Sequence, residues 1–175
     1  NWAWLQAVKA GEVMIDAALP WRTLAGRDRF TLRDLRADSS RDDQRVDVAL
    51  QGQRSKAILL ALGGSEDDIK RVSGLAWAGV TRATLGGFDL IVSRTGYTGE
   101  RTAYELFVHP ARAADLFHAL MAGGAVPCGL AARDSLRTEA GLPLYGHELG
   151  GDHQLNPADA GFGSYVNLYK PFFVG

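Results

Sequence analysis

The chain has 175 residues, 46% of them apolar and 22% charged, which suits one sizeable globular domain or two small ones. Its 19 basic and 20 acidic residues give a formal net charge of −1, so the charge balance gives no reason to expect nucleic acid or an anionic membrane as a partner. No apolar run could cross a bilayer and no secretory signal is visible, so we expect a cytoplasmic protein without membrane spans. Cys128 is the single cysteine, so we also expect no disulfide and no bound metal.

The first predicted elements are a helix, a strand and a charged segment. Apolar residues recur at near-helical spacing over residues 2–10, and Gly11 ends that helix. Residues 13–19 are predicted to form a strand. Charges of both signs crowd residues 27–47, which is typical of a solvated surface of strand and loop. The alternation that follows, over residues 46–50, predicts another strand.

The middle of the chain predicts two helices and a hairpin. One helix runs through residues 57–60, and a second short helix begins after Ser65, a favoured N-cap residue that acids follow. Residues 79–85 and 88–93 read as strands, and the Gly-Gly pair between them predicts a tight hairpin. We expect Trp77, just before the hairpin, to lie in the core.

The last predicted elements are a strand over residues 104–109, a helix that begins at Pro110 and runs to about residue 121, and a helix over residues 129–140 that Gly141 closes. Strands and helices alternate without a regular βαβ period. We therefore predict an α+β fold with mixed or antiparallel sheets and packed helices.

Two segments carry the residues suited to chemistry. Residues 94–100 read Arg-Thr-Gly-Tyr-Thr-Gly-Glu, where two glycines allow a tight bend and Tyr97 offers a flat face and a hydroxyl. Residues 129–146 place Arg133 and Arg137 one helical turn apart, with Asp134 able to pair with Arg137. On composition and spacing alone, the first is more often an ordinary hairpin loop and the second more often a surface helix with weak ion pairs.

Together these segments resemble the glycine cleavage system T protein family, the aminomethyltransferases. The similarity runs through residues 94–100, 129–137 and 139–146 in that order, with weaker similarity at residues 50–52, 156–157 and 172–175. The resemblance implies that residues 1–175 form the family's folate-binding region, with two interleaved, ferredoxin-like subdomains. It also implies a longer multidomain chain, since the family's N-terminal segment and C-terminal barrel domain lie outside these residues.

The resemblance implies a reaction and two binding partners. Enzymes of this family transfer a methylene from an aminomethyl group on a lipoyl arm to tetrahydrofolate and release ammonia. The lipoyl arm belongs to the H protein of the glycine cleavage system. Tetrahydrofolate has two adjacent N–H donors on its pterin edge, which suit a carboxylate, and carboxylates in its tail, which suit a guanidinium.

By resemblance, the pterin-binding glutamate falls on Glu105 and the arginine near the folate tail on Arg133. The run from Glu100 to Glu105 is one residue longer than the family pattern and lacks its glycine, so Glu100 is an alternative pterin ligand. Tyr97 is expected to shape the pocket near the pterin. The family's reacting aspartate belongs to a segment upstream of Asn1, so no catalytic residue is assigned.

Two other functions share this resemblance. One is a folate-linked demethylase module of the kind fused to sarcosine- or dimethylglycine-oxidising flavoproteins. The other is a folate-binding protein without transferase activity, of the type linked to iron–sulfur cluster assembly. Proteins of that second type carry a cysteine in the turn where this chain has Thr-Gly-Tyr at residues 95–97.

Overall fold

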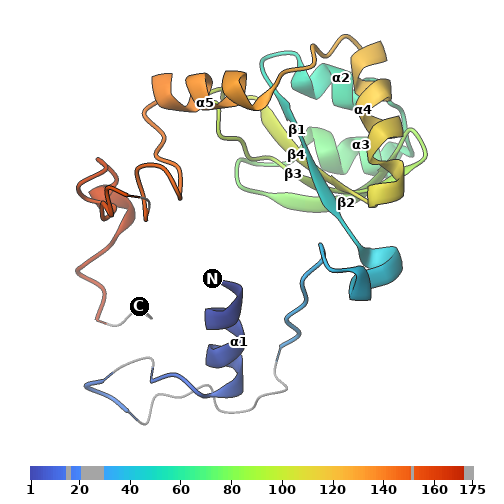
Figure 1. Ribbon diagram of the computed structural model, residues 1–175. Coiled ribbons are helices and arrows are strands. Elements are labelled where there is room, and N and C mark those ends of the chain that lie inside the picture. The colour runs from blue at the N-terminus through green and yellow to red at the C-terminus, as the bar shows by residue number, and fades with distance from the viewer. Residues whose placement is uncertain (15–16, 21–29, 151, 172–175) are drawn as a thin grey trace. The chain divides into compact units, whose positions relative to one another are not determined.

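A computed structural model describes residues 1–14, 17–20, 30–150 and 152–171 (Figure 1). The chain divides into two units, which are described separately below. The larger unit is Leu35–Leu155, and the smaller one joins Asn1–Asp34 to Asn156–Gly175. The weak family similarity at residues 172–175 lies outside the described residues.

The larger unit is built on a four-stranded antiparallel sheet. Its strands are β1 (Val46–Gln51), β2 (Val80–Leu85), β3 (Phe88–Ser93) and β4 (Ala103–Val108), in the order β1-β4-β3-β2. Consecutive strands β2, β3 and β4 form a meander, and β1 joins its far edge beside β4. The prediction of an α+β fold with an antiparallel sheet is confirmed.

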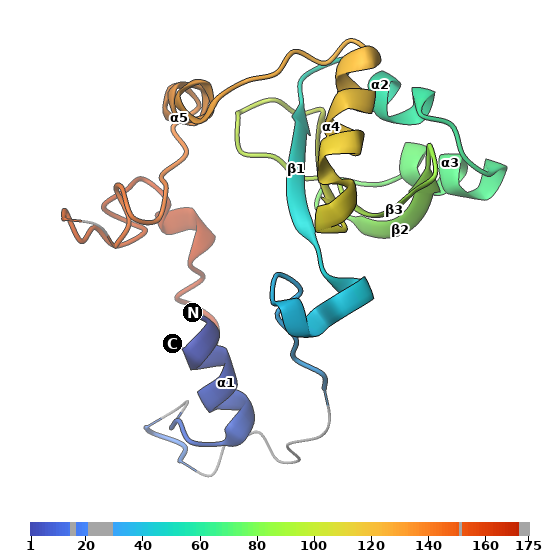
Figure 2. The same cartoon turned by 45° about the vertical axis from the view of Figure 1, so that its right-hand side comes forward.

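Three helices cover one face of this sheet: α2 (Ser55–Ala61), α3 (Glu66–Ser73) and α4 (Ala113–Ala122) (Figures 1 and 2). Alternate strand residues point to that face because side chains of a strand alternate. The core contains Leu50, Ile58, Leu59, Val72, Leu85, Leu90, Val92, Leu106, Leu116 and Leu120. Burial of each large side chain contributes about 1.5–3 kcal/mol, so this two-layer core stabilises the unit.

The opposite face of the sheet, here called the outer face, is open to solvent in part. On it, Asp47 and Ala49 of β1 are exposed, and Glu105 and Phe107 of β4 are half-buried. Beside this face lie the loop of residues 94–102 and helix α5 (Leu130–Glu139) (Figures 1 and 2). The outer face therefore carries the charged residues that the core face excludes.

Several local predictions are confirmed in detail. The Ser65 hydroxyl accepts a hydrogen bond from the Asp68 N–H at 3.1 Å and caps α3. Gly86 and Gly87 have φ values of 57° and 74°, which the tight hairpin between β2 and β3 requires. The segment that begins at Pro110 differs slightly, because its first turn is a 3₁₀ helix before α4 starts.

The strand predicted over residues 13–19 is wrong, and the solvated surface predicted over residues 27–47 is interrupted at Arg45. Residues 13–14 and 17–19 form bends and irregular backbone instead of the predicted strand, and residues 15–16 lie outside the described residues. Within the charged segment, Asp38–Asp43 forms 3₁₀ turns, and Arg45 is buried with 3% of its surface exposed. The Arg45 guanidinium donates to the Asp42 carbonyl at 3.0 Å and pairs with Asp89 of β3 at 2.6 Å.

The smaller unit contains α1 (Trp2–Ala10) and a 3₁₀ turn at Gly163–Tyr165. As predicted, α1 ends at Gly11, whose φ of 73° is the left-handed conformation that glycine adopts readily. None of the residues in these two elements is buried. Across the described parts of the chain, no helix combines the length and apolar character needed to cross a membrane.

Candidate functional site

The loop of residues 94–102 is clamped against the ends of β1 and β4. The Gln51 side chain donates to the Tyr104 carbonyl at 3.1 Å and accepts from the Thr98 hydroxyl at 3.2 Å. A Cβ atom at Gly96 would overlap Gln51 and Ala103, so only glycine allows this approach. The first glycine of the motif is therefore required by the fold of the loop.

Tyr97 ties the same loop to the chain that follows α5. Its hydroxyl donates a hydrogen bond to the Pro143 carbonyl, and its side chain is half-buried. At Gly99 the loop also approaches Ala140, to which an added Cβ atom would come within 2.6 Å. Tyr97 thus anchors the loop, and its predicted contact with a ligand stays a prediction.

Glu105 lies on the outer face, opposite Ala49 of β1 on one side and Ser93 of β3 on the other. The Thr95 hydroxyl donates to Oε2 of Glu105, and the hydroxyls of Ser93 and Thr95 are 2.8 Å apart. A hydroxyl has one proton, so Ser93 donates to Thr95 and Thr95 to Glu105. Among the described residues, no hydrogen bond reaches Oε1 of Glu105, which leaves this oxygen available as an acceptor.

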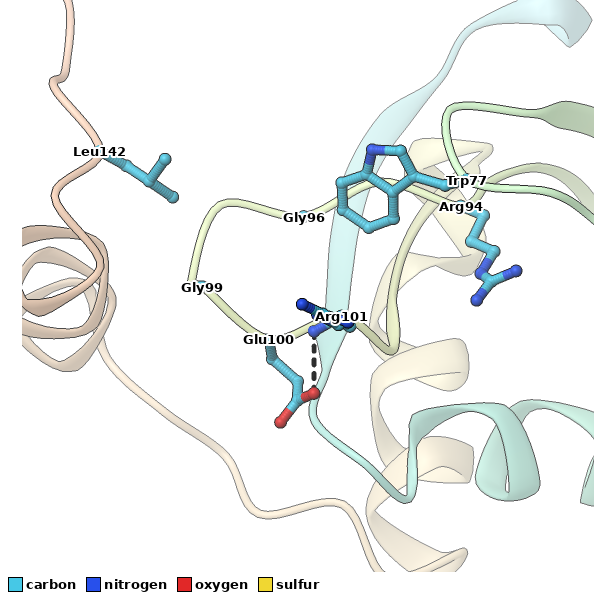
Figure 3. A pocket seen from close by; sticks show the side chains of 7 residues that line it. All are labelled: Trp77, Arg94, Gly96, Gly99, Glu100, Arg101 and Leu142. Atoms are coloured by element: carbon cyan, nitrogen blue, oxygen red, sulfur yellow. Dashed lines mark hydrogen bonds between the residues drawn. The ribbon is translucent and has the colours of Figure 1, made fainter. Parts of the chain in front are cut away.

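Glu100, the alternative pterin ligand, lies in different surroundings from Glu105. Its carboxylate accepts the backbone N–H of Arg101 at 2.8 Å and lies at the wall of a hollow of about 450 Å³ (Figure 3). Glu105 and Arg133 do not line this hollow. Its lining residues are Trp77, Arg94, Gly96, Gly99, Glu100, Arg101 and Leu142.

The hollow corrects the prediction for Trp77. This residue was expected in the core, but 54% of its surface is exposed and its indole forms a wall of the hollow (Figure 3). Leu142 contributes to the lining from the segment after α5. The hollow also contains Arg94 and Arg101, and the hydrogen bonds that Glu100 accepts from Arg101 and Thr102 both reach its Oε1. Glu100 therefore remains the alternative pterin ligand.

Arg133 is exposed on α5 and acts electrostatically on Asp47 of β1. Asp47 keeps contact with solvent, yet its pKa is raised, first by partial loss of hydration and then by the nearby charge of Glu105; Arg133 opposes this shift. Glu105 and Arg133 therefore both lie close enough to Asp47 to change its pKa. Asp47 belongs to no sequence motif, because its position near Glu105 depends on the pairing of β1 with β4.

Arg137, one turn after Arg133, has a structural role. It is 4% exposed, pairs with Asp134 and Glu148 at 2.6 Å each, and donates to the Leu142 carbonyl at 3.3 Å. The predicted pair with Asp134 is confirmed, and Arg137 is the buried residue of an otherwise largely exposed helix. This arginine fastens the segment after α5 to the helix.

Glu148 completes that network. It accepts the backbone N–H of Leu144 at 2.9 Å as well as the Arg137 guanidinium. These two bonds, the backbone bond first, lower its pKa from 4.5 to about 2. In the described residues, no cluster of three or more histidine, cysteine or acidic side chains could hold a metal ion.

The chain is similar to several known proteins. Residues 27–170 match the family model described as the GCVT N-terminal domain. The chain is 46% identical over 134 residues to a protein of Streptomyces avermitilis named aminomethyltransferase, which covers 73% of this chain and 34% of that protein. Proteins of the same name from Cutibacterium acnes and Herpetosiphon aurantiacus are 44% and 38% identical over 156 and 172 residues. These alignments cover 83% and 98% of this chain but 41% and 44% of the relatives, so the chain spans less than half their length.

Proposed function

Because this chain belongs to the GCVT N-terminal domain family, we propose that it forms the tetrahydrofolate-binding region of an aminomethyltransferase of the glycine cleavage system. In this reaction one nitrogen of tetrahydrofolate attacks the methylene carbon and the amine leaves as ammonia. A second folate nitrogen then displaces the lipoyl sulfur of the H protein, which leaves as a thiol, so the methylene ends bonded to two folate nitrogens. The relatives named aminomethyltransferase support the proposal. Their greater length supports a longer protein in which further segments complete the catalytic site.

The observation that carries the proposal is the state of Glu105 on the outer face. One of its carboxylate oxygens is held by Thr95, and the other has no hydrogen bond within the described residues. The pterin edge offers adjacent N–H donors, and a charge-assisted bond to a carboxylate is stronger than a neutral one. Arg133, in the same region, is available for the carboxylates of the folate tail.

The proposed contribution of this chain to the reaction is positioning and charge stabilisation. Glu105 would fix the pterin, so that the attacking folate nitrogen faces the methylene carbon. No covalent bond to the protein is needed, because the folate nitrogen displaces the amine directly. Arg133 would hold the far end of the cofactor and limit its rotation during this step.

Two further properties belong to the proposal. The layer of helices over one face of a four-stranded antiparallel sheet supports ferredoxin-like subdomains, although here β1 lies at the edge of the sheet. A chain with one cysteine needs no oxidising compartment, which supports a cytoplasmic location.

A matched pair of substitutions tests the binding site. In the full-length protein, Glu105→Gln removes the charge from the outer face, and Glu100→Gln removes it from the hollow. We expect anaerobic calorimetric titration to show tetrahydrofolate bound about 10- to 100-fold more weakly by Glu105→Gln, since hydrogen bonds to charged groups contribute about 1.5–3 kcal/mol. The affinity of Glu100→Gln should equal that of the wild type. The reverse pattern would move the pterin site to Glu100, and no change in either variant would refute the assignment.

The reaction itself is tested with the aminomethylated lipoyl carrier. An aminomethyltransferase releases ammonia when tetrahydrofolate is added, and omission of either substrate abolishes the release. A folate-linked demethylase module or a protein that only binds folate would release none from this donor.

A further inference from the structure

The pairing of β1 with β4 places two carboxylates diagonally on the outer face. Asp47 lies opposite Phe107, and Ala49 lies opposite Glu105, so these four residues occupy the corners of one patch. In an antiparallel pair, directly opposite Cβ atoms are about 4.5–5.5 Å apart and diagonal neighbours about 7–8 Å. The side chains of Asp47 and Glu105 thus start from backbone positions about 7–8 Å apart, which is of the order of a flat ring's width.

The floor of this patch is small and apolar. Ala49 is exposed and adds only a methyl group beside Glu105, while Phe107 is half-buried and offers part of its ring beside Asp47. A flat ring system can pack on such a floor, since aromatic and apolar surfaces suit it. The same floor provides no competing hydrogen-bonding group between the two carboxylates.

The charges around the patch are close but unpaired. Within the described residues, neither Asp47 nor Arg133 forms a hydrogen bond or an ion pair, although the Arg133 charge acts on Asp47. Several other acids near arginines in the described residues do pair. They include Asp68 with Arg71, Asp89 with Arg45, Asp115 with Arg112, and Asp134 and Glu148 with Arg137. The acids of the patch therefore keep carboxylate oxygens that are free to accept hydrogen bonds, whereas the paired acids use theirs within the fold.

We propose that Asp47 is a second ligand-contacting carboxylate, which with Glu105 brackets a flat ring bearing N–H donors over Ala49 and Phe107. This inference rests on the proposed function and deepens it, since the ring is the pterin of tetrahydrofolate. Asp47 is a binding and positioning residue here. The Arg133 guanidinium compensates the extra negative charge, which allows two carboxylates on one small patch.

Four forms of the full-length protein test the inference: wild type, Asp47→Asn, Glu105→Gln and the control Asp115→Asn. Asp115 is an exposed acid on α4, the helix that covers the opposite face of the sheet. Asp47 is itself exposed on a strand, so the amide variant retains the fold. We expect anaerobic titration to show tetrahydrofolate bound about 10-fold more weakly by Asp47→Asn and unchanged by Asp115→Asn.

The pH dependence supplies a readout that a merely structural residue would not change. An ionised carboxylate accepts from N–H groups with both oxygens, whereas a protonated one carries an O–H donor on one of them. Lost hydration, followed by the charge of Glu105, raises the pKa of Asp47 and keeps it protonated to higher pH than a free aspartate. Wild-type affinity should therefore fall as pH drops through the raised pKa of Asp47. This part of the pH dependence should be absent from Asp47→Asn, while the titration of tetrahydrofolate itself affects both proteins equally.

The outcomes separate the two proposals. Weaker binding by both Asp47→Asn and Glu105→Gln supports the bracket. Weaker binding by Glu105→Gln alone overturns the role of Asp47 and leaves the proposed function standing. Unchanged binding by Glu105→Gln overturns the proposed site and the bracket together, whatever the Asp47 variant shows.

Discussion

Glu148 is a single carboxylate whose ionisation is tied to the position of a whole segment. The Leu144 N–H and the Arg137 guanidinium hold its pKa at about 2, against an ordinary value of 4.5. A group whose pKa is lower in the folded state contributes stability above its unfolded pKa. That contribution is lost as pH falls from about 4.5 through about 2.

The prediction at this residue is a change in acid stability. Glu148→Gln should lower the urea midpoint of unfolding at pH 6, because the Arg137 guanidinium loses its ionic partner. The variant should then lose less stability than the wild type between pH 4.5 and pH 2, since it lacks the titrating group. Urea titrations across this range measure both effects. The control is Glu139→Gln, which lies on α5 with Arg137. Parallel curves for Glu148→Gln and wild type would show that the bonds from Leu144 and Arg137 do not lower the pKa of Glu148 in solution.

Single residues also show where prediction from sequence fails. The pair of Asp134 and Arg137 could be predicted, because helical spacing alone brings the two side chains together. The burial of Arg137 could not, since Glu148 reaches it from a loop whose path no local pattern fixes. The position of Asp47 near Glu105 could not be predicted for the same reason, because strand pairing defines its neighbours.

At the scale of elements, the contact between the 94–102 loop and the end of α5 depends on two glycines with different surroundings. Gly99 has φ of 82°, and an added Cβ atom would lie 2.6 Å from that of Ala140. Gly141 has φ of 69° with nothing within 4 Å of an added Cβ atom. A side chain at either position would therefore carry the cost of a left-handed backbone, and only one at Gly99 would also clash with a neighbour.

We predict that alanine at these positions separates the two penalties. Gly141→Ala should cost about 1 kcal/mol in the free energy of unfolding, the cost of a left-handed conformation. Gly99→Ala should cost about 2–3 kcal/mol, because crowding against Ala140 adds to the same backbone term. Chemical denaturation of both variants provides the comparison. Equal costs would mean that the loop and α5 are not in contact.

The elements that could be predicted are those with local signals. Ser65 caps α3 and the Gly-Gly pair turns the hairpin, since each needs only its immediate neighbours. Residues 13–19 have a strand-like apolar composition, but a strand also needs a hydrogen-bonded partner, and composition cannot supply one. The 3₁₀ turns at Asp38–Asp43 were missed because charge crowding indicates exposure without indicating backbone conformation.

At the scale of the whole molecule, stability is concentrated in the middle of the sheet. β3 and β4 have strand neighbours on both sides, whereas β1 and β2 form the edges. Helix α1 has no buried residue. Alternating strands and helices allowed prediction of the fold class, but the order β1-β4-β3-β2 depends on long-range pairing that no local pattern encodes.

Hydrogen exchange should reproduce this ranking. In the 175-residue chain, we expect the slowest amides at Leu90, Val92 and Leu106, where exchange requires opening of the central strands. The amides of α1 should exchange orders of magnitude faster, because few buried contacts oppose their opening. Two-dimensional NMR after transfer into D₂O measures both classes. Protection of α1 equal to that of β4 would contradict the division of the chain into two units.

The hydroxyls of Ser93 and Thr95 reduce the conformational entropy that Glu105 loses when it binds a hydrogen-bond donor. The last torsion of a glutamate side chain is broad, so a solvated carboxylate samples many directions. Here Thr95, itself oriented by Ser93, fixes one oxygen and thereby aims the other. The loss of rotational freedom occurs during folding, and an incoming donor does not have to impose it again. Directional preference at this acid is thus encoded ten residues earlier in the chain, in a threonine that need not touch the donor at all.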